Sequence, residues 1–293
     1  MLIADSQWVS SKGTTNHRQV CRHWIGIEVF ANASGYGLTF GLHTRVNARV
    51  DQLTNRINAG NIYVNRNQIG AIVGSQPFGG EGLSGTGPKA GGPHYVRRFM
   101  TYDSLRVGAE GTGNKISAGE LAKAVKAVNQ TTAVDLETRQ AVLKKLCNNS
   151  PAALDAEPSE MPGPTGELNL LSCVPRGTII CAGPDAESAR TQALVALSQG
   201  NKVVAIAPCI EAELQQQTTL PLLAIDGFLD SAGLATVDGF DAIASSAATN
   251  VLSAYRNALA ARDGTALADV LKRHLSNKCE TVKSHLESEN AES

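Results

Sequence analysis

A glycine-rich segment, residues 67–99, carries the residues of this chain that are best suited to binding chemistry. It reads NQIGAIVGSQPFGGEGLSGTGPKAGGPHYVRRF and holds nine of the chain's 28 glycines. Apolar residues recur between the glycines, at Ile72, Phe78, Leu83 and Tyr95, without the serine repetition of a flexible spacer. Apolar anchors pin a loop, and glycines expose backbone N–H groups that can bind an anion such as a carboxylate. The segment therefore predicts an ordered loop that contacts a ligand.

One part of this loop matches a dinucleotide fingerprint by its letters alone. Residues 85–90 (GTGPKA) fit G-x-G-x-x-G/A, but that motif requires a strand before it and a helix after it. Here residues 77–80 (PFGG) precede it and Pro88 lies inside it, which argues against a role in holding a cofactor. Lys89 is followed by alanine rather than serine or threonine, so a Walker loop is excluded as well.

Two other residues, Cys21 and His94, are of types that can serve as a nucleophile or a base. Cys21 is followed by Arg22 and His23, cations that could lower the pKa of its thiol. Neighbours in sequence need not meet in space, however, and we do not assign Cys21 as a catalytic nucleophile. His94 has no carboxylate that the sequence identifies as its partner, which favours a packed loop histidine over a general base.

The composition is that of a globular protein without a strong electrostatic field. Hydrophobic residues make up 42% and charged residues 18% of the 293, the net charge is −1 and the pI is about 6.6. This balance does not favour binding to nucleic acid, and no apolar run reaches the ~18 residues of a membrane span. The six cysteines form neither a CxxC pair nor a zinc pattern, which predicts a reducing cytoplasmic setting and no metal site. Cys173, Cys181 and Cys209 lie in apolar runs and are expected in the core.

The elements before the loop must position it. Residues 38–44 and 61–65 are predicted strands, and a helix is expected over residues 46–58, where apolar side chains recur at helical spacing. Gly60 follows this helix at the place of a C-cap glycine. The strand at residues 61–65 leads directly into the glycine-rich loop.

The second half of the chain alternates strands and helices. A strand over residues 178–182, a helix over residues 186–199 with Asp185 as N-cap, and a strand over residues 202–207 make a β-α-β unit with parallel strands. Later apolar pieces and a helix over residues 250–261 continue the alternation, which predicts a Rossmann-like α/β domain. The turn before the first helix (AGPD) lacks the glycines for a pyrophosphate, and Asp185 puts negative charge where phosphate would bind. We expect a Rossmann shape without a nucleotide.

Composition and punctuation divide the chain into segments. In order, these are an irregular segment at 1–25, the loop-bearing region at 26–110, a helical and proline-rich linker at 111–164, the Rossmann-like domain at 165–275 and a solvated tail at 276–293. Within the linker, Ser117 and Glu120 predict a capping box at the start of the first of two helices.

Three stretches resemble the C-terminal part of aldehyde dehydrogenases. They are residues 32–45 (NASGYGLTFGLHTR), 60–65 (GNIYVN) and above all 75–95 (SQPFGGEGLSGTGPKAGGPHY). PFGG followed by SG is shared broadly in that superfamily, whereas GTGPKAGGPHY is similar to the L-glutamate γ-semialdehyde (1-pyrroline-5-carboxylate) dehydrogenases. Residues 161–168 (MPGPTGEL) and 259–264 (LAARDG) resemble the C-terminal region of the proline utilization A family, bifunctional enzymes that also contain a proline dehydrogenase. The expected fold is α/β, the end of an aldehyde dehydrogenase catalytic domain followed by a helical linker and a Rossmann-like domain.

The resemblance implies a step of proline catabolism in a bacterial cytoplasmic, membrane-peripheral, homo-oligomeric enzyme. It implies that L-glutamate γ-semialdehyde is oxidised to glutamate and that NAD takes the hydride, while FAD serves a proline dehydrogenase domain that this chain lacks. Gly70 and Ala71 match the pair whose backbone N–H groups anchor the substrate carboxylate. Phe78 matches the aromatic residue that packs on the substrate's aliphatic stem.

Departures from the family pattern limit what this chain is expected to do alone. The family's nucleophilic cysteine lies well upstream of PFGG, and Cys21 is too close to Pro77 to match it. The motif that contacts the nicotinamide ribose is not matched, since residues 28–30 (EVF) are followed by Ala31. We therefore expect a C-terminal fragment, inactive and without a cofactor by itself, whose missing domains lie on an upstream polypeptide. The alternative is a non-enzymatic scaffold or assembly module that docks on a partner chain.

Overall fold

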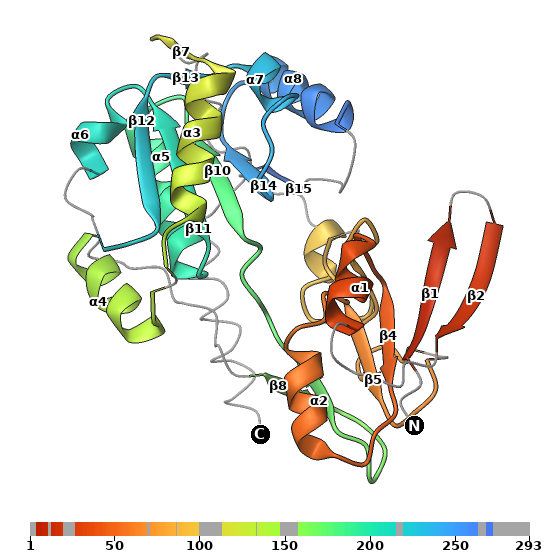
Figure 1. The fold of residues 1–293 in the computed structure, drawn as a ribbon. Helices are drawn as coiled ribbons and strands as arrows, with labels where there is room; N and C mark the ends of the chain where they lie inside the picture. Colours follow the sequence, from red (N-terminus) through yellow and green to blue (C-terminus); the bar gives the residue numbers. More distant parts are fainter. Residues whose placement is uncertain are drawn as a thin grey trace. The chain divides into compact units, whose positions relative to one another are not determined.

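The chain folds into two compact units (Figure 1). The first comprises residues 1–100, 159–171 and 263–266, and the second comprises residues 101–158, 172–262 and 267–293. The computed structural model describes residues 4–10, 13–19, 27–68, 71–85, 87–99, 113–132, 134–146, 158–214, 219–262 and 268–271. The predicted mixed α/β class is confirmed. In the described part of the chain, no helix combines the length and the apolar character that a membrane crossing requires.

A four-stranded sheet with the order β2-β1-β4-β5 lies in the first unit. Its strands are β1 (Ala4–Ser10), β2 (Gly13–Gln19), β4 (Thr39–Leu42) and β5 (Asn61–Val64). Strand β5 runs parallel to β4, whereas β1 is antiparallel to both β2 and β4. Because β5 leads into the glycine-rich loop, the core of this sheet fixes where the loop begins.

Two helices and several short pieces complete the first unit. They are α1 (Ile27–Ala33), β3 (Tyr36–Gly37), α2 (Asn47–Thr54), β6 (Glu81–Gly82), the 3-10 turn η1 (Val96–Phe99), and the hairpin of β8 (Ser159–Met161) and β9 (Asn169–Leu171). Helix α2 packs its buried Leu53 against Phe40 and Leu42 of β4, with Ile57 closing the cluster. The predicted α2 and β5 are confirmed within a few residues.

The structure differs from the sequence prediction at residues 1–25 and at Gly60. An antiparallel hairpin of β1 and β2 occupies much of the segment expected to be irregular. Its strands are mostly polar, so they lack the hydrophobic alternation by which a strand is recognised. Helix α2 ends at Thr54 with Asn55 as its C-cap, so the C-cap role predicted for Gly60 is wrong.

The second unit is built on a parallel five-stranded sheet with the order β12-β11-β10-β14-β15. The strands are β10 (Thr178–Ala182), β11 (Lys202–Ala207), β12 (Leu222–Asp226), β14 (Ala242–Ser245) and β15 (Ala268–Leu271). Two short strands, β7 (Lys115–Ile116) and β13 (Phe228–Leu229), form a separate parallel pair. Strand order reverses between β10 and β14, as in doubly wound sheets.

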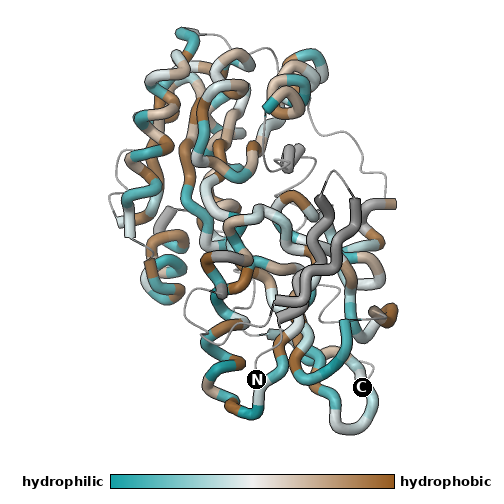
Figure 2. Tube along the Cα trace, turned by 45° about the vertical axis from the view of Figure 1, so that its right-hand side comes forward, coloured by the Kyte–Doolittle hydropathy of each residue, from teal (hydrophilic) through white to brown (hydrophobic). Residues whose placement is uncertain are grey.

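Helices cover both faces of this sheet (Figure 1). One face receives α3 (Ala118–Asn129), α7 (Ser231–Leu234) and α8 (Thr249–Ala260), and the other receives α4 (Leu136–Leu146), α5 (Ala186–Ser198) and α6 (Ile210–Leu214). Alternate strand residues serve the two faces: Ile180 points to the first and Cys181 to the second. Figure 2 shows the matching alternation of hydrophobic and hydrophilic residues along the helices.

Helices α3 and α4 are therefore part of the second unit, not a linker between domains. The predicted capping box is present, with Ser117 Oγ accepting from the Glu120 backbone and the Glu120 carboxylate accepting from the Ser117 backbone. Leu121, Val125 and Val128 of α3 are buried in the same cluster as Ile180. The sequence showed the apolar stripe but not its partner, because the sheet that α3 covers begins about fifty residues later.

Candidate functional site

The described parts of the glycine-rich loop, residues 71–85 and 87–99, follow a path fixed by backbone hydrogen bonds. Phe78 and Ala90 form a reciprocal bridge, with Phe78 N donating to Ala90 O at 2.9 Å and Ala90 N donating to Phe78 O at 2.8 Å. Nearer the start of the loop, Gly74 N donates to Gly91 O at 3.0 Å. Gly74 and Gly91 have φ of 82° and 71°, values that glycine adopts without strain. These hydrogen bonds order the described parts of the loop, and its contact with a ligand stays a prediction.

The backbone at Gly60 lies in close contact with the backbone of the loop at Gly79 and Gly80. A Cβ atom on Gly60 would lie 1.8 Å from the carbonyl oxygen of Gly79 and 2.8 Å from the Cα of Gly80. Asn61, the next residue, spans the same junction: its Nδ2 donates to Pro77 O at 2.8 Å and its Oδ1 accepts from Gly79 N at 3.2 Å. Gly60 is thus a glycine because the PFGG segment lies against it.

Lys89 joins the same two segments through its side chain. Its Nζ donates to Gly79 O at 2.8 Å and also to Gly60 O. Burial lowers the pKa of Lys89, and the nearby carboxylate of Glu81 opposes that shift. A cation that is partly shielded from water is stabilised by the carbonyl oxygens that accept its hydrogen bonds.

The β8–β9 hairpin contacts the first part of the loop through Gln76. The Gln76 side chain is buried, and its Nε2 donates to Glu167 Oε1 and, at 3.4 Å, to Asn169 Oδ1. Arg66 Nη1 donates to the same Glu167 oxygen at 2.7 Å. Glu167 therefore ties β5 and the loop to a hairpin that lies about a hundred residues later in the chain.

We expect Glu167→Gln to destabilise the first unit by about 1–2 kcal/mol. The change removes the charge that Arg66 pairs with, and the partial exposure of both side chains limits the loss. Urea unfolding followed by amide NMR signals of Phe40 and Leu42 measures it. Glu160→Gln, an exposed carboxylate of β8, is the matched control and should change stability by less than about 0.5 kcal/mol. Equal losses in both variants would contradict the role of Glu167.

The residues expected to bind substrate have different standing in the structure. Ala71 and Phe78 are exposed on the described part of the loop, and the Phe78 side chain is 38% accessible. Gly70 and Cys21 lie outside the described residues. His94 is half-buried, as a packed loop residue would be. The roles assigned to Gly70, Ala71 and Phe78 stay predictions.

Cysteines of the described residues all belong to the second unit. Cys181 is buried as predicted, but Cys173 and Cys209 are exposed, so the core position expected for those two is wrong. Cys173 lies on the approach to β10, and Cys209 lies in the turn after β11 with φ of 62°. Apolar neighbours in sequence misled here because both residues sit just outside a strand. No cluster of three metal-binding side chains occurs among the residues described.

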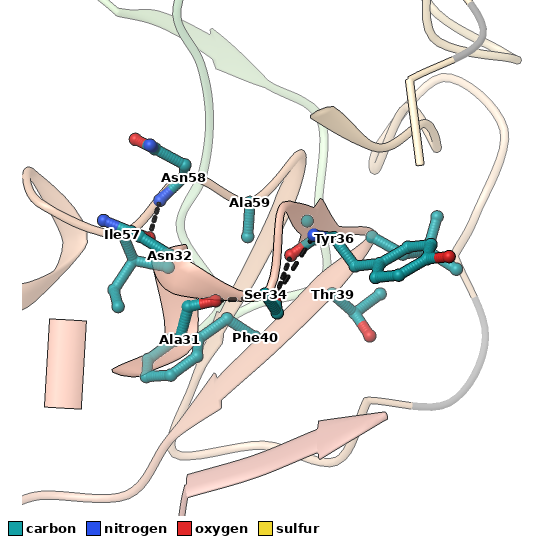
Figure 3. Close-up of a pocket in the computed structure, with 11 residues that line it drawn as sticks. Ala31, Asn32, Ser34, Tyr36, Thr39, Phe40, Ile57, Asn58 and Ala59 are labelled. Atoms are coloured by element: carbon teal, nitrogen blue, oxygen red, sulfur yellow. Dashed lines mark hydrogen bonds between the residues drawn. The ribbon is translucent and has the colours of Figure 1, made fainter. Parts of the chain in front are cut away.

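A small pocket near the start of β4 is lined by Ala31, Tyr36, Phe40 and Ala59, among others (Figure 3). Its cavity volume is about 30 Å³. A water molecule requires roughly 10–15 Å³, so this pocket has room for water and not for a dehydrogenase substrate. Among the polar residues that line it, Ser34 accepts a hydrogen bond from Tyr36 N at 3.1 Å and donates one to Ala31 O at 2.8 Å.

The first turn of the Rossmann-like unit does not fit the pyrophosphate of a dinucleotide. Asp185 Oδ1 accepts from Ser188 N at 2.7 Å, so a carboxylate already caps the N-terminus of α5. Pro184 has no N–H to offer. A Cβ on Gly183 would lie 2.5 Å from Ala189 N, so this glycine is required for packing between strand and helix. These residues support the expectation of a Rossmann shape without a nucleotide.

Sequence reasoning missed Lys89, Asn61 and Glu167 as residues that build the site. One signal was available: Lys89 and Glu81 are the charged residues inside a run of glycine, proline and small residues. The partners of Asn61 and Glu167 had no local signal.

Comparison with known proteins identifies relatives of both halves of the chain. The aldehyde dehydrogenase family matches residues 27–105. The bifunctional protein PutA of Escherichia coli (strain K12) is 37% identical over 239 residues, which are 80% of this chain and 18% of that protein. The 1-pyrroline-5-carboxylate dehydrogenase 1 of Halalkalibacterium halodurans is 50% identical over 70 residues, 24% of this chain and 14% of that enzyme. The chain therefore spans less than a fifth of the length of either relative.

Among solved structures, a mutant of proline utilization A (PutA) from Bradyrhizobium japonicum is 59% identical over 26% of this chain and 8% of that one, with a TM-score of 0.25. A score this low carries no argument about the arrangement of the chain. The sequence matches confirm the predicted resemblance to aldehyde dehydrogenases and to the proline utilization A type.

Proposed function

We propose that this chain, whose residues 27–105 match the aldehyde dehydrogenase family, supplies the substrate-anchoring part of an L-glutamate γ-semialdehyde dehydrogenase of proline catabolism. The intact enzyme would oxidise the semialdehyde to glutamate. The observation that carries the proposal is the glycine-rich loop, whose fixed backbone leaves Ala71 and Phe78 exposed on one segment. The names of the relatives, PutA and 1-pyrroline-5-carboxylate dehydrogenase, supply the substrate class.

In this proposal the chain's own residues bind and orient the substrate. The backbone N–H groups of Gly70 and Ala71 donate to the substrate carboxylate, and the ring of Phe78 packs on its aliphatic stem. Anchoring both ends of a short flexible molecule removes its freedom to rotate, which is what places the aldehyde carbon for attack. NAD, bound in the intact enzyme, would accept the hydride. The turn before α5 does not fit NAD, so we assign no residue of this chain to hydride transfer.

The loop also displays apolar side chains that a lone globular unit would bury. Val73 is 83% accessible and its sequence neighbour Ile72 is exposed as well, and Phe99 at the end of the loop is 75% accessible. Exposed large apolar side chains such as these are typical of a surface that a further part of a protein covers. The matched part is 14% of the Halalkalibacterium enzyme, so we propose that the remaining aldehyde dehydrogenase residues cover this surface.

Production of NADH from 1-pyrroline-5-carboxylate, followed at 340 nm, tests the proposal. We expect no turnover from this chain alone, and turnover once it is combined with a polypeptide that carries the remaining aldehyde dehydrogenase residues of a relative. In the combined enzyme, Ala71→Pro removes a backbone N–H and should lower kcat/KM by about 10–100-fold, because a hydrogen bond to a carboxylate is lost.

Ala71→Val is the matched control, since it keeps the N–H and should leave kcat/KM within about threefold. Equal losses in the two variants would count against the anchoring role. Turnover by the chain alone that disappears in Cys21→Ala would overturn the expectation that the nucleophile lies elsewhere.

A second candidate function rests on the second unit, which has a complete core on both faces of its sheet and a first turn closed to dinucleotides. Such a unit suits a scaffold that docks on a partner chain. Stable association with the complementing polypeptide, without any turnover, would favour this scaffold over the split enzyme.

A further inference from the structure

We propose that Lys89 is the positioning residue of the substrate-anchoring loop: its side-chain amino group holds the carbonyls of Gly60 and Gly79 together and so fixes the segment that presents Phe78. The inference rests on the proposed function for its meaning, but its geometry is independent of any substrate. It concerns three segments of the first unit that are far apart in sequence and meet at one nitrogen atom.

The junction needs a donor that no backbone group there supplies. Gly60 and Gly79 approach so closely that a Cβ on Gly60 would collide with the Gly79 carbonyl, and both residues turn a carbonyl oxygen toward the same point. Two acceptors that converge without a donor would repel each other and leave lone pairs unsatisfied. A lysine amino group has donors and no competing acceptor when it is charged, and it satisfies both oxygens at once.

The stem of Lys89 also packs on the loop. A Cβ on Gly79 would lie 3.3 Å from both the Cα and the Cγ of Lys89, so the side chain runs directly over Gly79 before its amino group turns to the carbonyls. Partial burial lowers the pKa of the Lys89 amino group, which agrees with a nitrogen that is partly shielded from water. Glu81 is the charged neighbour that favours the protonated form.

The residues that follow Lys89 are hydrogen-bonded to the residues that we propose contact the substrate. Ala90, the next residue, makes two backbone hydrogen bonds with Phe78. Gly91, the residue after it, accepts from Gly74, which lies in the turn that follows Ala71. We infer that the Lys89 amino group fixes the position of Phe78 and of the turn at Gly74, which follows the proposed carboxylate-binding residue Ala71.

Hydrogen exchange of backbone amides in the ¹⁵N-labelled chain tests this inference. In Lys89→Met we expect the amides of Phe78 and Ala90 to exchange at least about tenfold faster than in the wild type, because their bridge is no longer held. Lys89→Arg keeps donors at the junction and should stay within about threefold. Lys123→Met, a change of the same kind on the exposed face of α3, should leave both amides unchanged.

A general loss of stability is separated from positioning by Leu53→Ala, which weakens the core of the first unit under β4 without touching the loop. We expect that variant to unfold more easily yet to keep the ratio of exchange at Phe78 and Ala90 to that at Leu42. If Lys89→Met does not fold, Lys89→Arg decides the test. Exchange at the Phe78 and Ala90 amides at the wild-type rate in Lys89→Arg supports the inference, and exchange as fast as in an unprotected loop overturns it. Unchanged exchange at Phe78 and Ala90 in a folded Lys89→Met overturns it as well.

Titration with L-glutamate separates this inference from the proposed function. If both hold, the Ala71 amide signal shifts with glutamate in the wild type and in Leu53→Ala, and the apparent Kd rises at least about tenfold in Lys89→Met. If Lys89→Met frees the loop but the wild type never responds to glutamate, the role of Lys89 in fixing the loop stands and the substrate assignment fails.

Discussion

Replacing Gly60 with alanine is expected to prevent the first unit from folding, or to cost it about 3–5 kcal/mol. The new Cβ would lie 1.8 Å from the Gly79 oxygen, 2.7 Å from the Gly79 carbonyl carbon and 2.8 Å from the Gly80 Cα. All three atoms are backbone, so no flexible side chain can move aside. The collision would also separate the two carbonyls that Lys89 joins. Amide NMR spectra of the first unit, with urea unfolding where the variant folds, measure the loss.

Gly119→Ala is the matched control for this change. Gly119 lies inside α3 with no atom within 4 Å of the place a Cβ would take, and alanine there should stabilise the second unit by about 0.5–1 kcal/mol. A Gly60→Ala variant within about 1 kcal/mol of the wild type would show that the PFGG segment does not lie against Gly60.

The second large effect is expected from Leu121→Ala in α3. Leu121 is 1% accessible and belongs to the cluster that contains Ile180 and Val204 of the parallel sheet. Removing three carbons from such a position costs about 2–5 kcal/mol, through lost burial and the cavity left behind. Urea unfolding followed at the amides of Ile180 and Val204 would show the loss in the second unit.

Leu136→Ala on α4 is the control, because the same three carbons are removed from a side chain that is 36% accessible. We expect a loss below about 1 kcal/mol. If residues 111–164 were only a linker, as the sequence suggested, both leucine variants would unfold at the wild-type urea concentration.

The strands and helices of the second unit could be predicted because their signals are local. Asp185 caps α5, Gly200 follows its end with φ of 82°, and the flanking strands β10 and β11 are apolar after their first residues, Thr178 and Lys202. Each of these features is decided by residues within one or two turns of chain. The capping box of Ser117 and Glu120 was predicted for the same reason.

The parts that escaped prediction depend on residues far apart in sequence. Gly60 had a plausible local role as a helix cap, and only the arrival of Gly79 shows why no side chain fits. Lys89 reaches Gly60 across 29 positions, and Glu167 reaches Gln76 across 91. Pattern and propensity carry no information about such pairings, so the loop could be recognised as ordered while the residues that order it could not.

The way the chain is divided between its units has a consequence for how it folds during synthesis. Residues 159–171 return to the first unit after the chain has entered the second, and the contact between Arg66 and Glu167 spans 101 positions. Closing so long a loop carries an entropic cost that local contacts do not. We expect the first unit to leave the ribosome with its last hairpin still missing. A nascent chain stalled after residue 110 would then be digested faster by protease at its anchoring loop than one stalled after residue 262.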